Sequence, residues 1–167
     1  MRLAVGDLVV YTPYGIGRVA AREKRAVLGA EREIVVLELA DGLTVTLPME
    51  RAREHLRPAA SEADMRRVQE TLREDHALDA DPWLKRRKDT QAKLADGDPI
   101  KIAEIVRDGA RRERTLTRKG AGSQLSLGER ELFVKARRLL SGEIALARGF
   151  EPAEADAWID EQLTPTS

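Results

Sequence analysis

The sequence of 167 residues contains no cysteine and only two histidines. The lack of cysteine excludes disulfides and thiolate-bound metals, and it is typical of proteins from a reducing compartment. His55 and His76 have no evident partner, so we expect both to be surface or structural residues. No His-x-x-x-His, Cys-His or Gly-x-Ser-x-Gly pattern is present. We therefore predict no enzymatic activity, no metal and no cofactor.

Long apolar runs are missing as well. No apolar stretch approaches the ~20 residues needed to span a bilayer. The N-terminal segment Met1–Asp7 lacks the apolar run of a signal peptide. These features predict a soluble, cytoplasmic protein, and nothing in the sequence requires more than a monomer.

An excess of charge of either sign is also absent. Lys and Arg total 29, as do Asp and Glu, which gives a formal net charge of zero. Such a chain is not a general binder of polyanions, so any contact with nucleic acid has to come from a local basic patch. Hydrophobic residues make up 42% of the sequence, which is enough to form a core.

The first 58 residues have the pattern of a small β domain. Short runs at 8–11, 18–27, 32–39 and 43–47 are strand candidates, and the last of them alternates with period two. Pro13 to Gly17 is typical of a turn, and Asp41-Gly42 is a strong hairpin signal. Short strands at this spacing predict a strongly bent antiparallel barrel.

From residue 61 the apolar period becomes helical. Capping residues or prolines at helix starts recur along this half, at Ser61, Pro82, Asp98-Pro99, Ser126 and Pro152. They predict a bundle of about five helices. The helix that opens at Pro82 should end near Gly97, and we expect the Gly-, Lys- and Ser-rich segment 117–124 to be a flexible loop.

The change of period near Ala59-Ala60 predicts two domains. One is a small antiparallel β barrel over residues 1–58, and the other is a helical bundle over residues 61–164. The expected fold class is therefore α+β.

Trp83 is one of two tryptophans in a chain with 4% aromatic residues. Asp81 can cap a helix and Pro82 suits its first position, which places Trp83 in the first helical turn. A run of four basic residues follows at Lys85, Arg86, Arg87 and Lys88. Cations at such a helix tip can bind phosphates while the ring reaches a base step.

The alternative is that Trp83 belongs to the core and that the basic run is a solvated helix face. Four consecutive charges surround a helix, however, so some of them must face a neighbour or a ligand. The second tryptophan, Trp158, lies among alanines, Ile159 and acidic residues, and we interpret it as a core residue.

A second basic stretch is interleaved with acidic residues. It comprises Arg107, Arg111, Arg112, Arg114, Arg118 and Lys119. These residues either extend a DNA-facing surface or form salt bridges along the helix. Salt bridges are favoured for Arg111, and both interpretations stay open for the others.

The β half offers a different kind of surface. A sheet of this size leaves an edge strand exposed, and such an edge can accept a strand from a partner. Leu43–Leu47, between Asp41-Gly42 and Pro48, is a candidate edge strand. An edge protected by charge or by a short bulge is the alternative.

Taken together, these segments resemble the CarD (CdnL-like) family of bacterial transcription regulators. The resemblance covers most of the chain and rests on the order and spacing of several motifs. They are Val5–Tyr11 with Gly15, Leu43–Pro48, Pro82–Arg87, Leu94–Asp98, Ile102–Asp108, Leu125–Arg130 and Lys135–Arg137.

The resemblance implies a Tudor-like N-terminal domain that docks on the β subunit of RNA polymerase. It also implies a helical domain that contacts promoter DNA at the upstream edge of the bubble and stabilises the open complex. The residue at Trp83 would wedge into the minor groove. The basic residues would contact the backbone there, at Lys85, Arg86 and Lys88, with Arg87 in the same run.

For docking on the polymerase, the resemblance points to Arg25 and to the edge strand, with Val45, Thr46 and Leu47. Thr46 stands where some family members carry arginine, which bears on the strength of docking. The segment 115–124 is longer than is usual in the family. Two other functions fit the residues alone: a free-standing architectural DNA-binding protein, and a protein–protein adaptor without DNA contact.

Overall fold

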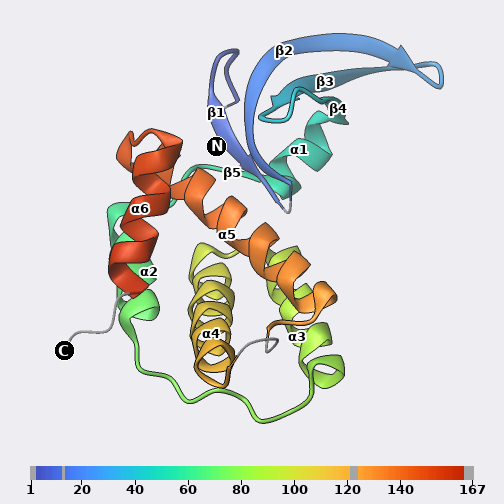
Figure 1. Ribbon diagram of the computed structural model, residues 1–167. Coiled ribbons are helices and arrows are strands. Elements are labelled where there is room, and N and C mark those ends of the chain that lie inside the picture. Colours follow the sequence, from blue (N-terminus) through green and yellow to red (C-terminus); the bar gives the residue numbers. More distant parts are fainter. Residues whose placement is uncertain (1–2, 13, 121–123, 164–167) are drawn as a thin grey trace. The chain divides into compact units, whose positions relative to one another are not determined.

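The computed structural model describes residues 3–12, 14–120 and 124–163. The chain divides into two compact units, residues 1–59 and 60–167. The first unit is built on a β-sheet and the second is built from helices (Figure 1). The predicted α+β class is therefore confirmed.

The first unit contains an antiparallel sheet of five strands. They are β1 (Leu8–Tyr11), β2 (Gly15–Val27), β3 (Ala30–Leu39), β4 (Thr44–Pro48) and β5 (Leu56–Arg57). The order β4-β3-β2-β1-β5 places β4 at one edge of the sheet. The long strand β2 curves strongly (Figure 1), with an irregular register against β3 between Val19 and Ala21. This curvature lets one face of the sheet enclose a small core.

Two tight turns set the register of this sheet. Leu28 and Gly29 connect β2 to β3 with φ angles of 50° and 78°, as a two-residue hairpin turn requires. The hairpin predicted at Asp41-Gly42 is confirmed: the Leu43 N–H donates to Asp41 Oδ1 at 3.0 Å, and Gly42 has a φ of 89°.

The prediction that the first 58 residues contain only strands is wrong, because Met49–His55 forms the helix α1. Met49, Ala52 and Leu56 are spaced three and four residues apart, and all three are buried in the core of the β unit. This spacing was the available signal for the helix. It was hard to recognise because the helix has only seven residues.

The turn predicted from Pro13 to Gly17 is also displaced. Gly15 and Gly17 already pair with β1 as part of β2. The chain reverses just before them, where the Tyr14 N–H donates to the carbonyl of Tyr11 at 2.6 Å. Pro13 lies outside the described residues.

The second unit contains five helices within the described residues. They are α2 (Glu62–Arg73), α3 (Trp83–Asp96), α4 (Pro99–Arg118), α5 (Leu127–Arg148) and α6 (Pro152–Leu163). Their apolar stripes share one core, formed by residues such as Met65, Val68, Val106, Ala136, Leu140, Ile144 and Ile159. The predicted bundle of about five helices is confirmed.

Most of the predicted helix ends are confirmed. Ser61 accepts a hydrogen bond from the Asp64 N–H in a complete capping box. Asp98 accepts one from the Ile100 N–H, with Pro99 as the first helical residue. The helix α3 ends at Gly97, whose φ of 74° is the left-handed conformation that glycine adopts without strain.

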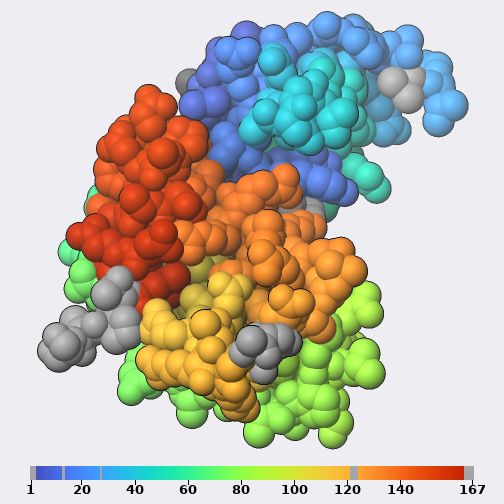
Figure 2. All heavy atoms as spheres, viewed as in Figure 1, coloured from blue at the N-terminus to red at the C-terminus, as the bar shows by residue number. Residues whose placement is uncertain are grey.

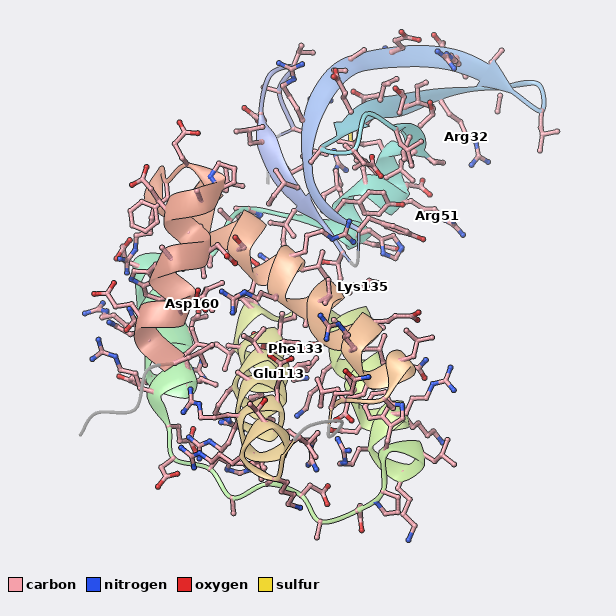
Figure 3. The ribbon with its side chains drawn as sticks, viewed as in Figure 1. Arg32, Arg51, Glu113, Phe133, Lys135 and Asp160 are labelled. Carbon is pink, nitrogen blue, oxygen red and sulfur yellow. The ribbon has the colours of Figure 1, made fainter. Side chains whose placement is uncertain are left out.

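The loop predicted to begin at residue 115 or 117 begins later than expected, because α4 continues to Arg118. Residues 121–123 lie outside the described residues. Close packing explains a glycine inside this long helix. A Cβ at Gly109 would lie 2.3 Å from the Phe133 ring, which is carried by α5 (Figure 3).

The last helix is attached to α5 by an ion-pair cluster on its exposed side. Arg137 donates to the carboxylates of Asp156 at 2.9 Å and Asp160 at 2.7 Å. Burial by itself lowers the pKa of Arg137, but the hydrogen bonds and charges of the two aspartates outweigh it and raise this pKa overall. Arg137 therefore remains charged at any physiological pH.

Candidate nucleic-acid interface

Trp83 is the first residue of α3, at the tip of the helix. The prediction that it lies in the first turn is confirmed. The predicted cap is wrong: Pro82, not Asp81, occupies the N-cap position, and no side chain caps the helix. Pro82 still explains the helix start, because its fixed φ admits the chain into a helix and it has no N–H to satisfy.

The indole of Trp83 lies against the first turn of α5. A Cβ built at Gly128 would be 3.3 Å from the indole Nε1, so the glycine permits a close approach. Trp83 is half-buried and, among the described residues, it is not part of the apolar core of the bundle. Leu84 and Leu127, the chain neighbours of Trp83 and Gly128, are 80% and 74% exposed. The ring therefore lies at an apolar surface rather than inside the core.

Arg86 lies beside this ring and faces the protein. Its guanidinium carbon is 5.3 Å from the centre of the indole, within the range of a cation–π contact. Its Nε donates to the Asp81 carbonyl and one terminal nitrogen donates to Glu129, both at 2.8 Å. The Arg86 side chain is only 15% exposed.

The other three members of the basic run point away from the bundle. Lys85, Arg87 and Lys88 are all exposed. Within the ranges that the structure describes, none of them forms an ion pair with an acidic side chain. The run therefore supplies three available cations next to the indole. Arg86 meets the expectation that at least one of the four basic residues faces a neighbour.

Glu129 connects α3, α4 and α5 behind the ring. Its carboxylate receives Arg86 of α3 and also lies 3.4 Å from Arg112 Nε of α4. Ser126 caps α5 by accepting from the Glu129 N–H at 3.3 Å. The sequence identified Ser126 and Glu129 as a helix start but gave no indication that the Glu129 carboxylate would bind Arg86.

Four of the six residues in the second basic stretch, all of them on α4, bind groups of the protein itself, whereas Arg118 and Lys119 are exposed. Arg107 is 4% exposed and pairs with Glu74 and Asp108. Arg111 pairs with Asp75 and donates to the carbonyls of Glu74 and His76. Arg112 and Arg114 donate to the carbonyls of Asp79 and Leu163. The interpretation of Arg111 as a salt-bridge residue is confirmed.

These contacts fix the segment 74–82, which has no regular secondary structure and leads directly into Trp83. Arginines from one helix bind the carbonyls of residues 74, 76 and 79 along it. The two basic stretches therefore differ in function. Arginines of α4 bind the segment that leads to the tip of α3, whereas α3 itself carries exposed cations next to that tip. In the space-filling view α3, in lime green, lies beside α5 at the surface of the unit (Figure 2).

The predicted docking residues lie on the β unit, and β4 is an edge strand as expected. Thr46 is exposed, whereas Leu47 is buried in the core and Val45 packs against it. Arg25 is exposed on the two-stranded extension of β2 and β3, opposite Arg32 (Figure 3), and pairs with Glu23 at 2.9 Å. A partner at this edge would thus meet outward-facing threonines and backbone groups, while Val45 and Leu47 support the strand from behind.

The part of the chain that the structure describes contains neither a grouping of metal ligands nor a membrane-spanning helix. Across residues 3–12, 14–120 and 124–163, no three or more His, Asp or Glu side chains are grouped so that they could bind a metal ion. No helix in these ranges has the length and apolar character needed to cross a membrane.

Comparisons with known proteins agree with this division into two units. Residues 3–60 match the CarD-like/TRCF RID domain, and residues 67–160 match the CarD C-terminal domain. The chain is also 23% identical over 147 residues to the "Putative transcription factor YdeB" of Bacillus subtilis (strain 168), which covers 87% of this chain and 92% of that protein.

Proposed function

The chain belongs to the CarD family of transcription factors, with a CarD-like/TRCF RNA polymerase interaction domain at its N-terminus, and from this premise we propose that it stabilises the promoter open complex. The β unit, expected at residues 1–58, docks on the β subunit of RNA polymerase. The helical unit, expected at residues 61–164, contacts promoter DNA at the upstream edge of the bubble. The protein acts in the cytoplasm, as a monomer and without catalysis.

The observation that carries the proposal is the position of Trp83. The indole lies at a helix tip outside the apolar core, beside three exposed cations that no ion pair occupies among the described residues. An apolar wedge flanked by phosphate-binding residues is the arrangement that opens a base step from the minor groove. Lys85, Arg87 and Lys88 bind the backbone on either side of it.

The mechanism requires no chemical step. A bubble closes when bases restack and pair at its upstream fork, and an inserted ring has to be expelled before that happens. Stacking of one aromatic ring on a base contributes roughly 1–3 kcal/mol. Since about 1.4 kcal/mol changes an equilibrium tenfold, one ring is enough to shift the population of open complexes.

Docking on RNA polymerase explains why a few exposed cations are enough for the DNA contact. With a net charge of zero, the chain has little long-range attraction for DNA. Binding to polymerase through the β4 edge and Arg25 holds the helical unit at a high effective concentration near the promoter. The DNA contact itself can then stay weak and tolerant of sequence.

The first test is Trp83→Ala in an open-complex lifetime assay with purified polymerase and promoter DNA. We expect the lifetime conferred by the protein to fall about tenfold, from the loss of one stacking contact. Binding to the polymerase β subunit, measured in parallel, should not change. An unchanged lifetime with intact β binding would contradict the wedge.

The second test concerns the docking surface. Arg25→Glu should weaken binding of the full-length protein to purified β subunit, because it reverses an exposed charge at the proposed interface. Arg18→Glu is the matched control, since Arg18 lies on the same strand, is 56% exposed against 53% for Arg25, and has its own glutamate partner. Equal loss in both variants would argue for general electrostatics instead of a specific interface.

A second test of the docking surface uses Thr46, which stands where some family members carry arginine. Thr46 is exposed at the sheet edge, where an arginine can reach a partner without disturbing the core. Thr46→Arg should therefore tighten binding to the β subunit. Unchanged binding would remove Thr46 from the interface, and weaker binding would mean that an arginine at this position clashes with the partner.

A further inference from the structure

Arg86 makes three directed contacts at once. One face of its guanidinium lies over the indole of Trp83, and its N–H groups reach the Asp81 carbonyl and the Glu129 carboxylate. The planar guanidinium presents its donors in a fixed fork, so these contacts define its orientation. A side chain held in this way can fix the position of the ring that it covers.

The same contacts make Arg86 a poor ligand for phosphate. Its charge is already paired with Glu129 at 2.8 Å, and both side chains are largely buried, at 15% and 11% exposure. Binding a phosphate would require this ion pair to break and would leave Glu129 with a weaker partner, Arg112, at 3.4 Å. Such a rearrangement is costly for a buried pair.

We propose that Arg86 is a positioning residue that holds the Trp83 indole at the angle needed for insertion, and that Glu129 and Gly128 complete this support. The inference rests on the proposed role of Trp83 at the DNA fork. It assigns Arg86 a different function from its neighbours Lys85, Arg87 and Lys88, which remain the phosphate contacts.

Each supporting residue has a separate geometric role. Glu129 binds a terminal nitrogen of the Arg86 guanidinium. The same carboxylate also pairs with Arg112, which connects Arg86 to α4. Gly128 leaves room for the indole against α5, because any Cβ there would press on Nε1 at 3.3 Å. A change in any of the three should move the ring without touching the exposed cations.

The position of the ring can be measured without DNA or polymerase. Trp158→Phe leaves Trp83 as the single tryptophan of the chain. In this background Arg86→Lys, which keeps the charge but loses the fork, and Glu129→Gln should each red-shift the Trp83 emission and increase its quenching by acrylamide. Lys85→Ala should leave both signals unchanged, because Lys85 is exposed. All variants are measured well below their melting transitions.

The functional readout separates positioning from charge. Arg86→Lys should shorten the open-complex lifetime about twofold to fivefold, because lysine lacks the directed donors that orient the ring, an effect about as large as one cation–π contact. Glu129→Gln should shorten it as well. A purely electrostatic view predicts the opposite sign for Glu129→Gln, because removing a negative charge near DNA strengthens binding.

The salt dependence of DNA binding gives a third comparison. Lys85→Ala should reduce the salt slope by about one, as expected for one lost phosphate contact. Arg86→Met should leave the slope unchanged, because Arg86 is bound to Glu129 and makes no phosphate contact that could be lost. A slope reduced equally by Arg86→Met would show that Arg86 binds phosphate and would overturn the proposal.

One further variant keeps the test decisive if the Arg86 or Glu129 changes impair folding. Gly128→Ala adds a single methyl group, favours the helix and leaves every charge in place. It should alter the Trp83 emission and shorten the lifetime. Unchanged emission in Arg86→Lys and in Gly128→Ala would refute the positioning role. Altered emission without an effect of Trp83→Ala on lifetime would instead refute the wedge.

Discussion

The two tryptophans of this chain have nearly the same immediate partners. Each is half-buried, each has an arginine over its ring, at 5.3 Å for Arg86 and 5.9 Å for Arg148, and each of these arginines pairs with a glutamate. The difference is what lies behind the ring. Trp158 packs against the bundle core, whereas Trp83 rests on one turn of α5 beside Gly128. An arginine stacked on an indole is therefore not a sign of function by itself.

The glutamates that pair with the two arginines differ in how exposed they are. Glu129, which binds Arg86, is 11% exposed, whereas Glu62, which binds Arg148, is 67% exposed. The buried Glu129 thus binds Arg86, which covers the ring at the surface. The exposed Glu62 binds Arg148, which covers the ring packed on the core. Rigid support is thus found where the ring has no core to fix it.

The largest expected effect comes from removing each ring in turn. Trp158→Ala should lower the free energy of unfolding by about 3 kcal/mol, because it leaves a cavity at the core. Trp83→Ala should cost about 1 kcal/mol, chiefly its contact with Arg86. Denaturant melts of both variants measure the difference. Equal losses would mean that Trp83 is a structural residue and would remove the basis of the comparison.

The sequence was sufficient to predict the placement of Trp83 but not its surroundings. Pro82 dictated a helix start, and Gly97 followed by Asp98-Pro99 dictated where that helix ends and the next begins. These are local signals that depend on backbone geometry alone. For that reason the helix tip and its basic run were predictable from neighbouring residues.

The orientation of each basic side chain was not predictable in the same way. Arg86 faces inward because Glu129, 43 residues further along the chain, lies opposite it. The arginines of α4 bind the segment 74–82 for the same kind of reason, since both elements meet only in the tertiary fold. The helix α1 escaped prediction because seven residues carry too few apolar positions to establish a period.

The smallest expected effect is the difference in stability between variants of the two glutamates, Glu129 and Glu62. Glu129→Gln removes the charge that balances a nearly buried Arg86, and should lower the free energy of unfolding by about 1–3 kcal/mol. Glu62→Gln changes an exposed pair in the first turn of α2, and should cost less than about 1 kcal/mol. Thermal melts at low and high salt measure both, and added salt should reduce only the Glu62 effect, because buried pairs are poorly screened. If the Glu129 effect were equally salt-sensitive, the pair would be open to solvent, and Arg86 would then be as free to leave the indole as Lys85 is to bind phosphate.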